Sequence, residues 1–117
     1  ADLSGLFTDA FRAARPDLCE QVAGWRREED AEPSVRAAAL DACRAFDAGP
    51  LYELTTPTLV LHAVDDPVVP MAVGAELGDG LPNGRFEAVA GRRLAHAEFS
   101  AAVNDEVLGF LEAHPLD

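Results

Sequence analysis

The stretch TPTLVLHAVDDPVVP, residues 56–70, decides how the chain folds. Its centre, residues 58–64, is a nearly continuous apolar run rich in β-branched residues. Such a run predicts a strand that is buried on both faces, as in a parallel sheet covered by helices. The Asp65-Asp66-Pro67 sequence ends the strand sharply, because Asp and Pro favour turns. The predicted fold class is therefore α/β.

Downstream of this stretch the pattern alternates between helix and strand. Residues 71–81 fit a short helix that Pro-Asn-Gly at 82–84 closes, and residues 85–90 alternate as a second strand. A loop at 91–95 follows, and residues 100–113 form an amphipathic last helix. The order strand, helix, strand, helix predicts a right-handed parallel crossover.

Upstream of the strand the chain is helical. We expect a first helix over residues 4–14, a second beginning at Pro16, and a third beginning at Pro33 with Ser34 as its N-cap. Gly49 and Pro50 end the third helix. Its apolar stripe is interpreted as core packing. The stripe consists of Val35, Ala38, Ala39, Ala42, Cys43 and Phe46.

Composition limits the class of protein. The chain has 117 residues, which allows one domain at most, and no apolar run reaches the ~18 residues of a membrane span. Nine basic and 21 acidic residues give a net charge of −12, which argues against nucleic acid and membrane surfaces as partners. Cys19 and Cys43 lack metal-ligand spacing, so we expect reduced thiols in a cytoplasmic protein. A disulfide between two packed helices is the alternative.

Two ionisable residues follow the two predicted strands. Asp66 comes after the first strand and His96 after the second. Functional groups of parallel α/β sheets lie beyond the carboxyl ends of the strands, so both loops open at one edge if the strands are adjacent. A carboxylate that accepts a hydrogen bond from a histidine fixes its tautomer and stabilises the imidazolium. The pair is therefore a candidate acid and base, whereas a turn aspartate and a surface histidine are the structural alternatives.

Other candidate residues have simpler explanations. Phe7, Phe11 and Trp25 suit the lining of an acyl pocket, but helix core is the commoner role of such residues. Arg92-Arg93 suits a substrate carboxylate or phosphate, although a solvated loop is the simpler interpretation. His62 is expected to be packed within the strand or at its edge, and His114 lies in the C-terminal tail.

Residues 56–70 closely resemble the acid-bearing segment of the α/β-hydrolase family, in which the acid comes three places after a small residue. Ala63 stands where the family usually has Gly, and counting from it identifies Asp66, not Asp65, as the acid. The turn at 82–86 and the segment His96-Ala97-Glu98-Phe99 are similar to the family's last strand turn and its histidine segment. The resemblance covers residues 44–113, and the loop Gly91-Arg92-Arg93-Leu94-Ala95 departs from the family's short glycine-rich approach to the histidine.

The resemblance implies the C-terminal part of an α/β-hydrolase, with residues 1–50 as a helical lid and residues 51–117 as a core segment. Asp66 and His96 would be the acid and the base of a catalytic triad that acts on an ester, thioester, lactone or related bond of a small organic substrate. No metal or organic cofactor is implied. The nucleophile is not found, since no Gly-x-Ser-x-Gly occurs in the sequence and none of the three serines follows a strand.

Two explanations of the missing nucleophile stay open. In the first, an N-terminal hydrolase segment, in the same protein or in a second chain, supplies it. In the second, the chain is an inactive fragment or a non-catalytic hydrolase-like binding module. Two strands leave unpaired sheet edges, so association, including a homo-oligomer, is also expected.

Overall fold

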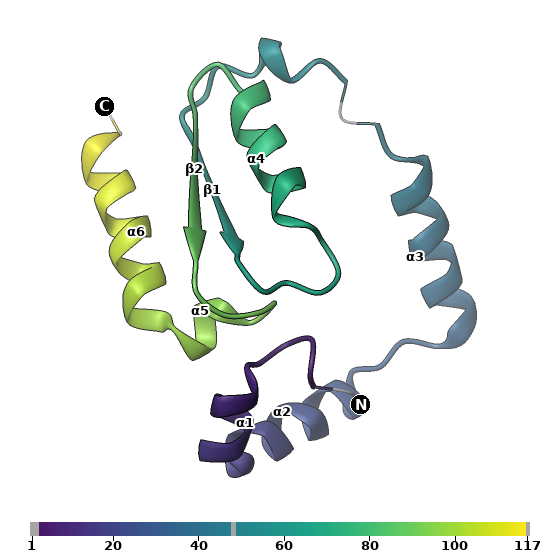
Figure 1. Cartoon of the computed structure of the whole chain (residues 1–117). Coiled ribbons are helices and arrows are strands. Elements are labelled where there is room, and N and C mark those ends of the chain that lie inside the picture. The colour runs from purple at the N-terminus through teal and green to yellow at the C-terminus, as the bar shows by residue number, and fades with distance from the viewer. Residues whose placement is uncertain (1–2, 48, 117) are drawn as a thin grey trace.

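The computed structural model describes residues 3–47 and 49–116. Figure 1 shows helices at the N-terminal end and a sheet with flanking helices towards the C-terminus. The elements are α1 (Asp9–Ala14), α2 (Pro16–Glu28), α3 (Pro33–Ala45), a 3₁₀ turn η1 (Leu51–Glu53), β1 (Thr58–Ala63), α4 (Met71–Gly80), β2 (Gly84–Val89), α5 (Ala95–Glu98) and α6 (Ser100–Ala113). The predicted α/β fold class is confirmed.

The two strands pair in parallel, from Thr58 opposite Gly84 to Ala63 opposite Val89. Helices α4 and α6 cover opposite faces of this sheet (Figure 1). His62 lies against α4, whereas the buried Ala63 and Val89 form a core cluster with Val103 of α6. Because successive side chains of a strand point to opposite faces of the sheet, each strand has side chains directed towards both helices. Both strands end at the same edge of the sheet, which is where the acid and histidine loops begin.

The predicted elements around the sheet agree with the structure to within one residue. The strand expected at 58–64 ends at Ala63, although the Val64 N–H still donates to the Val89 carbonyl at 2.9 Å. The helix expected at 71–81 ends at Gly80, and the strand expected at 85–90 is Gly84–Val89. The last helix has the predicted bounds. The handedness of the crossover stays a prediction.

The start of the first helix was predicted wrongly. The helix begins at Asp9, because the Thr8 hydroxyl accepts a hydrogen bond from the Phe11 N–H at 3.2 Å and caps it. Residues 3–7 instead form a turn, in which the N–H groups of Leu6 and Phe7 donate to the Leu3 carbonyl. The apolar side chains still form a core, since Leu6 and Phe7 are buried together with Cys19 of α2.

Helix α3 forms as predicted, but its apolar stripe is not packed. No residue of α3 is buried, and Phe46, which follows it, is 75% exposed. Figure 1 shows α3 standing away from the sheet and its helices. The expected N-cap is also wrong: Glu32 holds that position, without a side-chain hydrogen bond, and Pro33 opens the helix. The amphipathic pattern correctly predicts a helix, but the apolar side of this helix packs against no described residue.

Cys19 is buried, Cys43 is exposed and both are free thiols, so the disulfide alternative is wrong. The short helix α5 begins at Ala95, one residue inside the loop predicted for 91–95. In the part of the chain that the structure describes, no helix has the length and apolar character to cross a membrane.

Candidate active site

A pocket of about 230 Å³ opens at the carboxyl ends of the two strands, and both predicted site residues line it. Asp66 reaches it from the loop after β1, and His96 from α5, which follows β2. Apolar side chains of the sheet and of α6 form its walls. The full lining is Leu61, His62, Ala63, Asp66, Val89, Arg92, Arg93, Ala95, His96 and Val103. The topology therefore brings the two groups together as the sequence predicts.

The backbone of its own loop holds the Asp66 carboxylate. Its Oδ1 accepts hydrogen bonds from the N–H groups of Val68 at 2.8 Å and Val69 at 3.1 Å. Burial raises the pKa of Asp66, but these two bonds and the nearby Arg93 and His62 outweigh burial, so the pKa is lowered below its ordinary value of 3.8. Asp66 is therefore ionised at neutral pH, as a triad acid must be.

His62 is the nearest histidine to Asp66. Its Nε2 lies 3.9 Å from Asp66 Oδ2 and 2.8 Å from the Val69 carbonyl, and its side chain is 10% exposed. The hydrogen bond to a carbonyl requires Nε2 to carry the proton. The sequence placed His62 correctly as a packed strand residue but missed its contact with the acid loop. The signal was its position one residue before the last residue of the strand, on the face that α4 covers.

His96 is exposed and lies in the four-residue helix α5. The hydrogen bonds of the described residues include none between His96 and Asp66. The triad contact is thus not formed in this structure, and the catalytic roles of the two residues stay predictions. What the structure does show is that both side chains border one small pocket.

The acid and histidine loops are linked through their backbones. The Asp65 N–H donates to the Gly91 carbonyl at 3.0 Å, so the chain just before Asp66 is joined to the start of the histidine loop. Gly91 has a φ of 106°, a conformation that side chains rarely adopt. A Cβ at this position would also lie 2.9 Å from the Phe99 ring. Glycine thus allows the histidine loop to turn tightly beside the acid loop.

The N-terminal turn supports the histidine loop from the other side. The Leu94 N–H donates to the Leu6 carbonyl at 2.9 Å, and the Arg93 N–H to the Gly5 carbonyl at 3.2 Å. The Thr8 N–H donates to Glu98 Oε1 at 2.8 Å, and its hydroxyl to Glu98 Oε2 at 2.5 Å. Residues near the N-terminus therefore hold α5, the helix that carries His96, and the loop before it.

The aromatic residues proposed for an acyl pocket lie elsewhere. Phe7 is 2% exposed and packs against Phe11, with ring centroids 4.7 Å apart, in the core under the histidine loop. Trp25 is 55% exposed. None of the three lines the pocket of Asp66 and His96. The core interpretation is correct for Phe7 and Phe11. His114 packs on Phe110 at the end of α6.

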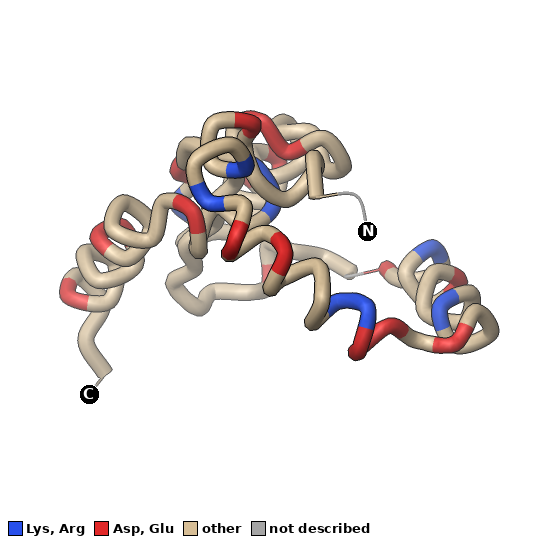
Figure 2. Tube along the Cα trace, turned by 90° about the horizontal axis from the view of Figure 1, so that it is seen from below, with Lys and Arg blue, Asp and Glu red and all other residues tan. Residues whose placement is uncertain are grey.

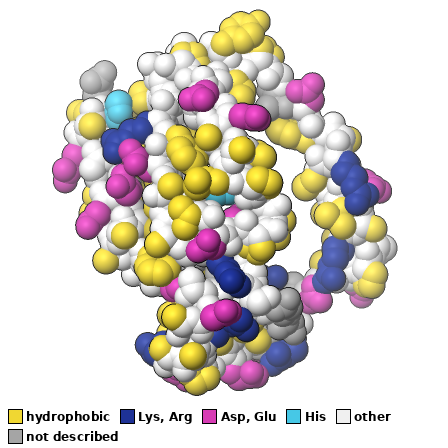
Figure 3. Space-filling model, viewed as in Figure 1, with side chains coloured by type: hydrophobic (Ala, Val, Ile, Leu, Met, Phe, Trp, Pro, Cys, Tyr) yellow, Lys and Arg dark blue, Asp and Glu magenta, His cyan; other side chains and the backbone are white. Residues whose placement is uncertain are grey.

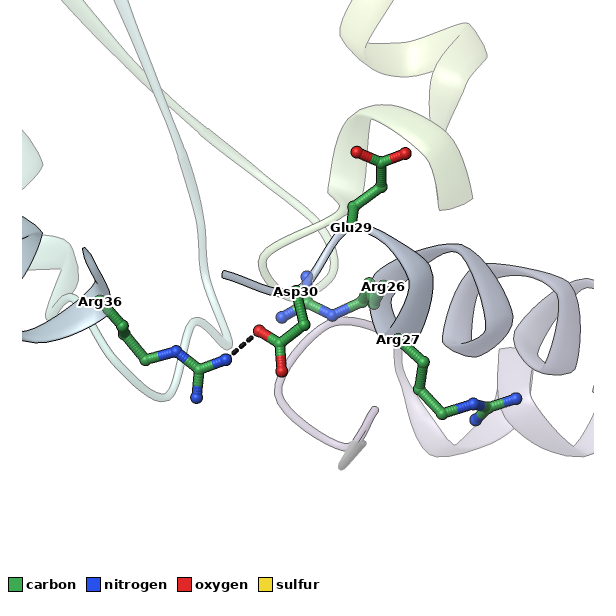
Figure 4. A pocket seen from close by; sticks show the side chains of 5 residues that line it. All are labelled: Arg26, Arg27, Glu29, Asp30 and Arg36. Carbon is green, nitrogen blue, oxygen red and sulfur yellow. Dashed lines mark hydrogen bonds and ion pairs between the residues drawn. The ribbon is translucent and has the colours of Figure 1, made fainter. Parts of the chain in front are cut away.

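A larger cavity of about 590 Å³ between α2 and α3 lacks the features of an active site. Arginines and acids line it (Figure 4), and no histidine does. Figure 4 shows Arg36 directed at Asp30, with which it forms an ion pair, and Arg27 directed away from them. Among the described residues, no group of three His, Cys, Asp or Glu side chains is placed to hold a metal ion.

Comparison with known proteins finds two hydrolases. An 82-residue stretch, 68% of this chain, is 40% identical to a protein of Variovorax paradoxus (strain S110) named as a carbamate hydrolase, RutD. A 114-residue stretch, 94% of this chain, is 32% identical to a 2-hydroxy-6-oxononadienedioate/2-hydroxy-6-oxononatrienedioate hydrolase of Cupriavidus pinatubonensis (strain JMP 134 / LMG 1197). The matches cover 30% and 37% of those proteins, so the chain spans about a third of their length. No protein-family model and no solved structure matches the chain.

Proposed function

We propose that this chain is the C-terminal part of an α/β-hydrolase and supplies the acid, Asp66, and the base, His96, of its catalytic triad. The observation that carries the proposal is that the two residues follow consecutive parallel strands and line one pocket. Their order along the chain, acid before histidine, is the order of α/β-hydrolases. The similarity to two named hydrolases supports the same class.

The substrate is proposed only as a class. One relative is named for a carbamate and the other for a dioate, so the names agree on hydrolysis and differ in the substrate. We propose an ester, thioester, lactone or related bond of a small organic molecule. A pocket of about 230 Å³ lined by five apolar and five ionisable residues suits part of such a molecule.

In the proposed mechanism, His96 accepts the proton of a nucleophile and later donates it to the leaving group. Asp66, kept ionised by the Val68 and Val69 N–H groups, accepts a hydrogen bond from the other ring nitrogen and stabilises the imidazolium. For this, the exposed His96 side chain turns towards Asp66 across the pocket that they share. The nucleophile comes from an N-terminal hydrolase segment outside this sequence, because no Gly-x-Ser-x-Gly occurs within it.

The test is turnover of a panel of activated esters by the complete protein. His96→Ala should lower kcat by a factor of about 10³ or more, because loss of a triad member removes the proton transfer. His114→Ala, at the far end of α6, is the matched control and should keep full activity. Undiminished turnover in His96→Ala would reject the triad assignment.

A second candidate, a non-catalytic hydrolase-like binding module, is favoured by the lack of a nucleophile elbow in the sequence. Intact-mass spectrometry of the purified protein under denaturing conditions separates the two. A polypeptide that contains a nucleophile elbow supports the hydrolase. A single species of 12.4 kDa without ester turnover supports the binding module.

A further inference from the structure

A third pocket, of about 530 Å³, adjoins the candidate active site and has two arginines in its lining. The N-terminal turn at residues 4–6, Arg26 of α2, Pro67 and Val68 of the acid loop, and Arg93 line it. No acidic side chain is among the lining residues. The lack of an acidic side chain is unusual in a chain with 21 acidic residues and a net charge of −12, whose acidic residues are distributed over most of the chain (Figure 2).

The arginines of this chain are otherwise paired. Six of the nine form ion pairs with carboxylates: Arg12, Arg15, Arg27, Arg36, Arg44 and Arg85. Arg92 donates to the Ser4 carbonyl. The guanidinium groups of Arg26 and Arg93 make no hydrogen bond or ion pair with a described residue. These two arginines, which come from elements far apart in the sequence, line the same pocket.

The pocket is placed where a substrate of the candidate active site would extend. Arg93 also lines the pocket of Asp66 and His96, so the two cavities share a wall. Pro67 and Val68, at the border of the arginine pocket, directly follow Asp66. A molecule with its reacting bond near His96 would therefore reach the guanidinium groups with its other end.

We propose that Arg26 and Arg93 form a subsite for a carboxylate group of the substrate. The planar guanidinium matches a carboxylate in geometry, and a charge-assisted bond of this kind is about twice as strong as a neutral one. The acidic surface elsewhere repels an anion, so the unpaired arginines select where it binds. The role in substrate binding rests on the proposed hydrolase function, whereas anion binding itself needs no catalysis.

The experiment is isothermal titration of the complete protein with hexanoate and with hexanamide, which differ in charge but hardly in size. Hexanoate should bind at least tenfold more tightly, and added salt should reduce the difference. Arg26→Met and Arg93→Met should each weaken hexanoate binding at least fivefold and leave hexanamide unchanged. Arg44→Met, on α3 and paired with Asp41, is the control and should bind hexanoate normally. Equal binding of the two probes, or unchanged hexanoate binding in both variants, would overturn the subsite.

His96→Ala separates this proposal from the triad. Its hexanoate binding should still depend on Arg26 and Arg93, because His96 does not line the arginine pocket. Hexanoate binding that depends on the arginines, with ester turnover retained in His96→Ala, would reject the triad and keep the subsite. Turnover that depends on His96, with hexanoate binding unaffected by the arginine variants, would keep the triad and reject the subsite.

Discussion

The candidate acid, Asp66, is held in place by its own loop, although it makes no hydrogen bond with His96. Asp66 accepts two backbone hydrogen bonds within its own loop, and its side chain is only 13% exposed. Donors fixed in the backbone, together with the nearby Arg93 and His62, lower the pKa of the carboxyl group although burial raises it. The acid is therefore ionised without any contact with His96.

This arrangement predicts an acid-dependent loss of stability. Because the pKa of Asp66 is lower in the folded chain than its ordinary value of 3.8, ionised Asp66 stabilises the fold above that value. The stabilisation is lost as the pH falls through the lowered pKa. Asp66→Asn should thus be less stable than the wild type at pH ~6, and the difference should shrink below pH ~4. Urea denaturation across this range measures it.

Asp65→Asn is the matched control for Asp66→Asn, because it removes an exposed acid from the same loop. Its free energy of unfolding should follow that of the wild type. If the difference between Asp66→Asn and the wild type were the same at every pH, the backbone bonds to Asp66 would not set its charge.

The close packing of Gly74 against His62 leads to a second prediction about single residues. A Cβ on Gly74 of α4 would lie 2.6 Å from His62 Nδ1 and 3.1 Å from the Phe86 ring. Gly74→Ala should therefore destabilise the chain by about 1–3 kcal/mol, as overpacking does. In α6, Gly109 has open space around it, so Gly109→Ala should be neutral or stabilise by up to ~1 kcal/mol. Thermal unfolding of both variants checks the contrast, and equal effects would contradict it.

The sequence predicted the candidate site in part. The placement of Asp66 and His96 beyond the strands was predictable because turn residues and chain order mark the ends of strands, and both residues line one pocket. Their catalytic roles stay predictions. The contact of His62 with the acid loop was missed, since strand periodicity gives the face of a residue but not what the following loop folds back onto. The lack of an ion pair at Arg93 could not be predicted from the sequence either, because ion pairs depend on how the elements pack in space.

At the scale of elements, the turn at residues 3–7, the N-cap Thr8 and helix α5 are joined. Glu98 of α5 accepts both the Thr8 N–H and the Thr8 hydroxyl. Thr8 in turn caps α1. One carboxylate therefore ties the helix that carries His96 to the start of α1.

Removing that carboxylate should loosen both parts. Glu98→Ala leaves the Thr8 N–H without its acceptor, and we expect a loss of about 1–3 kcal/mol, the cost of a donor left without a partner. Amide hydrogen exchange should become faster at Thr8 and Leu94, while Val60 in β1 should keep its protection. Glu112→Ala, an exposed acid on α6, should change none of these rates. Unchanged exchange at Thr8 in Glu98→Ala would contradict the link.

The sequence predicted the elements around the sheet well and the N-terminal third less well. β1, α4, β2 and α6 agree to within one residue, because their apolar periodicity is strong and Gly, Pro and Asp mark their ends. The apolar residues 6 and 7 continue the helical spacing of α1, so only the cap made by Thr8 shows that the helix starts later. The outward position of α3 follows from tertiary packing, which periodicity does not contain.

As a whole, the molecule is open. Its radius of gyration is 16.7 Å, whereas a compact domain of this length has about 13 Å. Figure 3 shows hydrophobic side chains gathered at the surface over α4 and a gap between this part and α3. On α4, Met71 is 40%, Val73 50% and Leu77 41% exposed. Exposed apolar area of this kind marks a surface that associates, which fits the proposal that a further hydrolase segment covers it.

Helix α3 should accordingly be the first part of the isolated chain to open. It buries no residue, so little beyond its own hydrogen bonds opposes local unfolding. Trypsin, which cleaves after arginine, should cut at Arg36 and Arg44 well before Arg85, which lies within β2 and pairs with Glu87 and Glu106. Mass spectrometry of a digestion time course gives the order. Early cleavage at Arg85 would show that the sheet is no more stable than α3. If a hydrolase segment packs on the apolar faces, as we propose, the complete protein should resist cleavage at Arg36 and Arg44, because opening α3 would then also break its contacts with that segment.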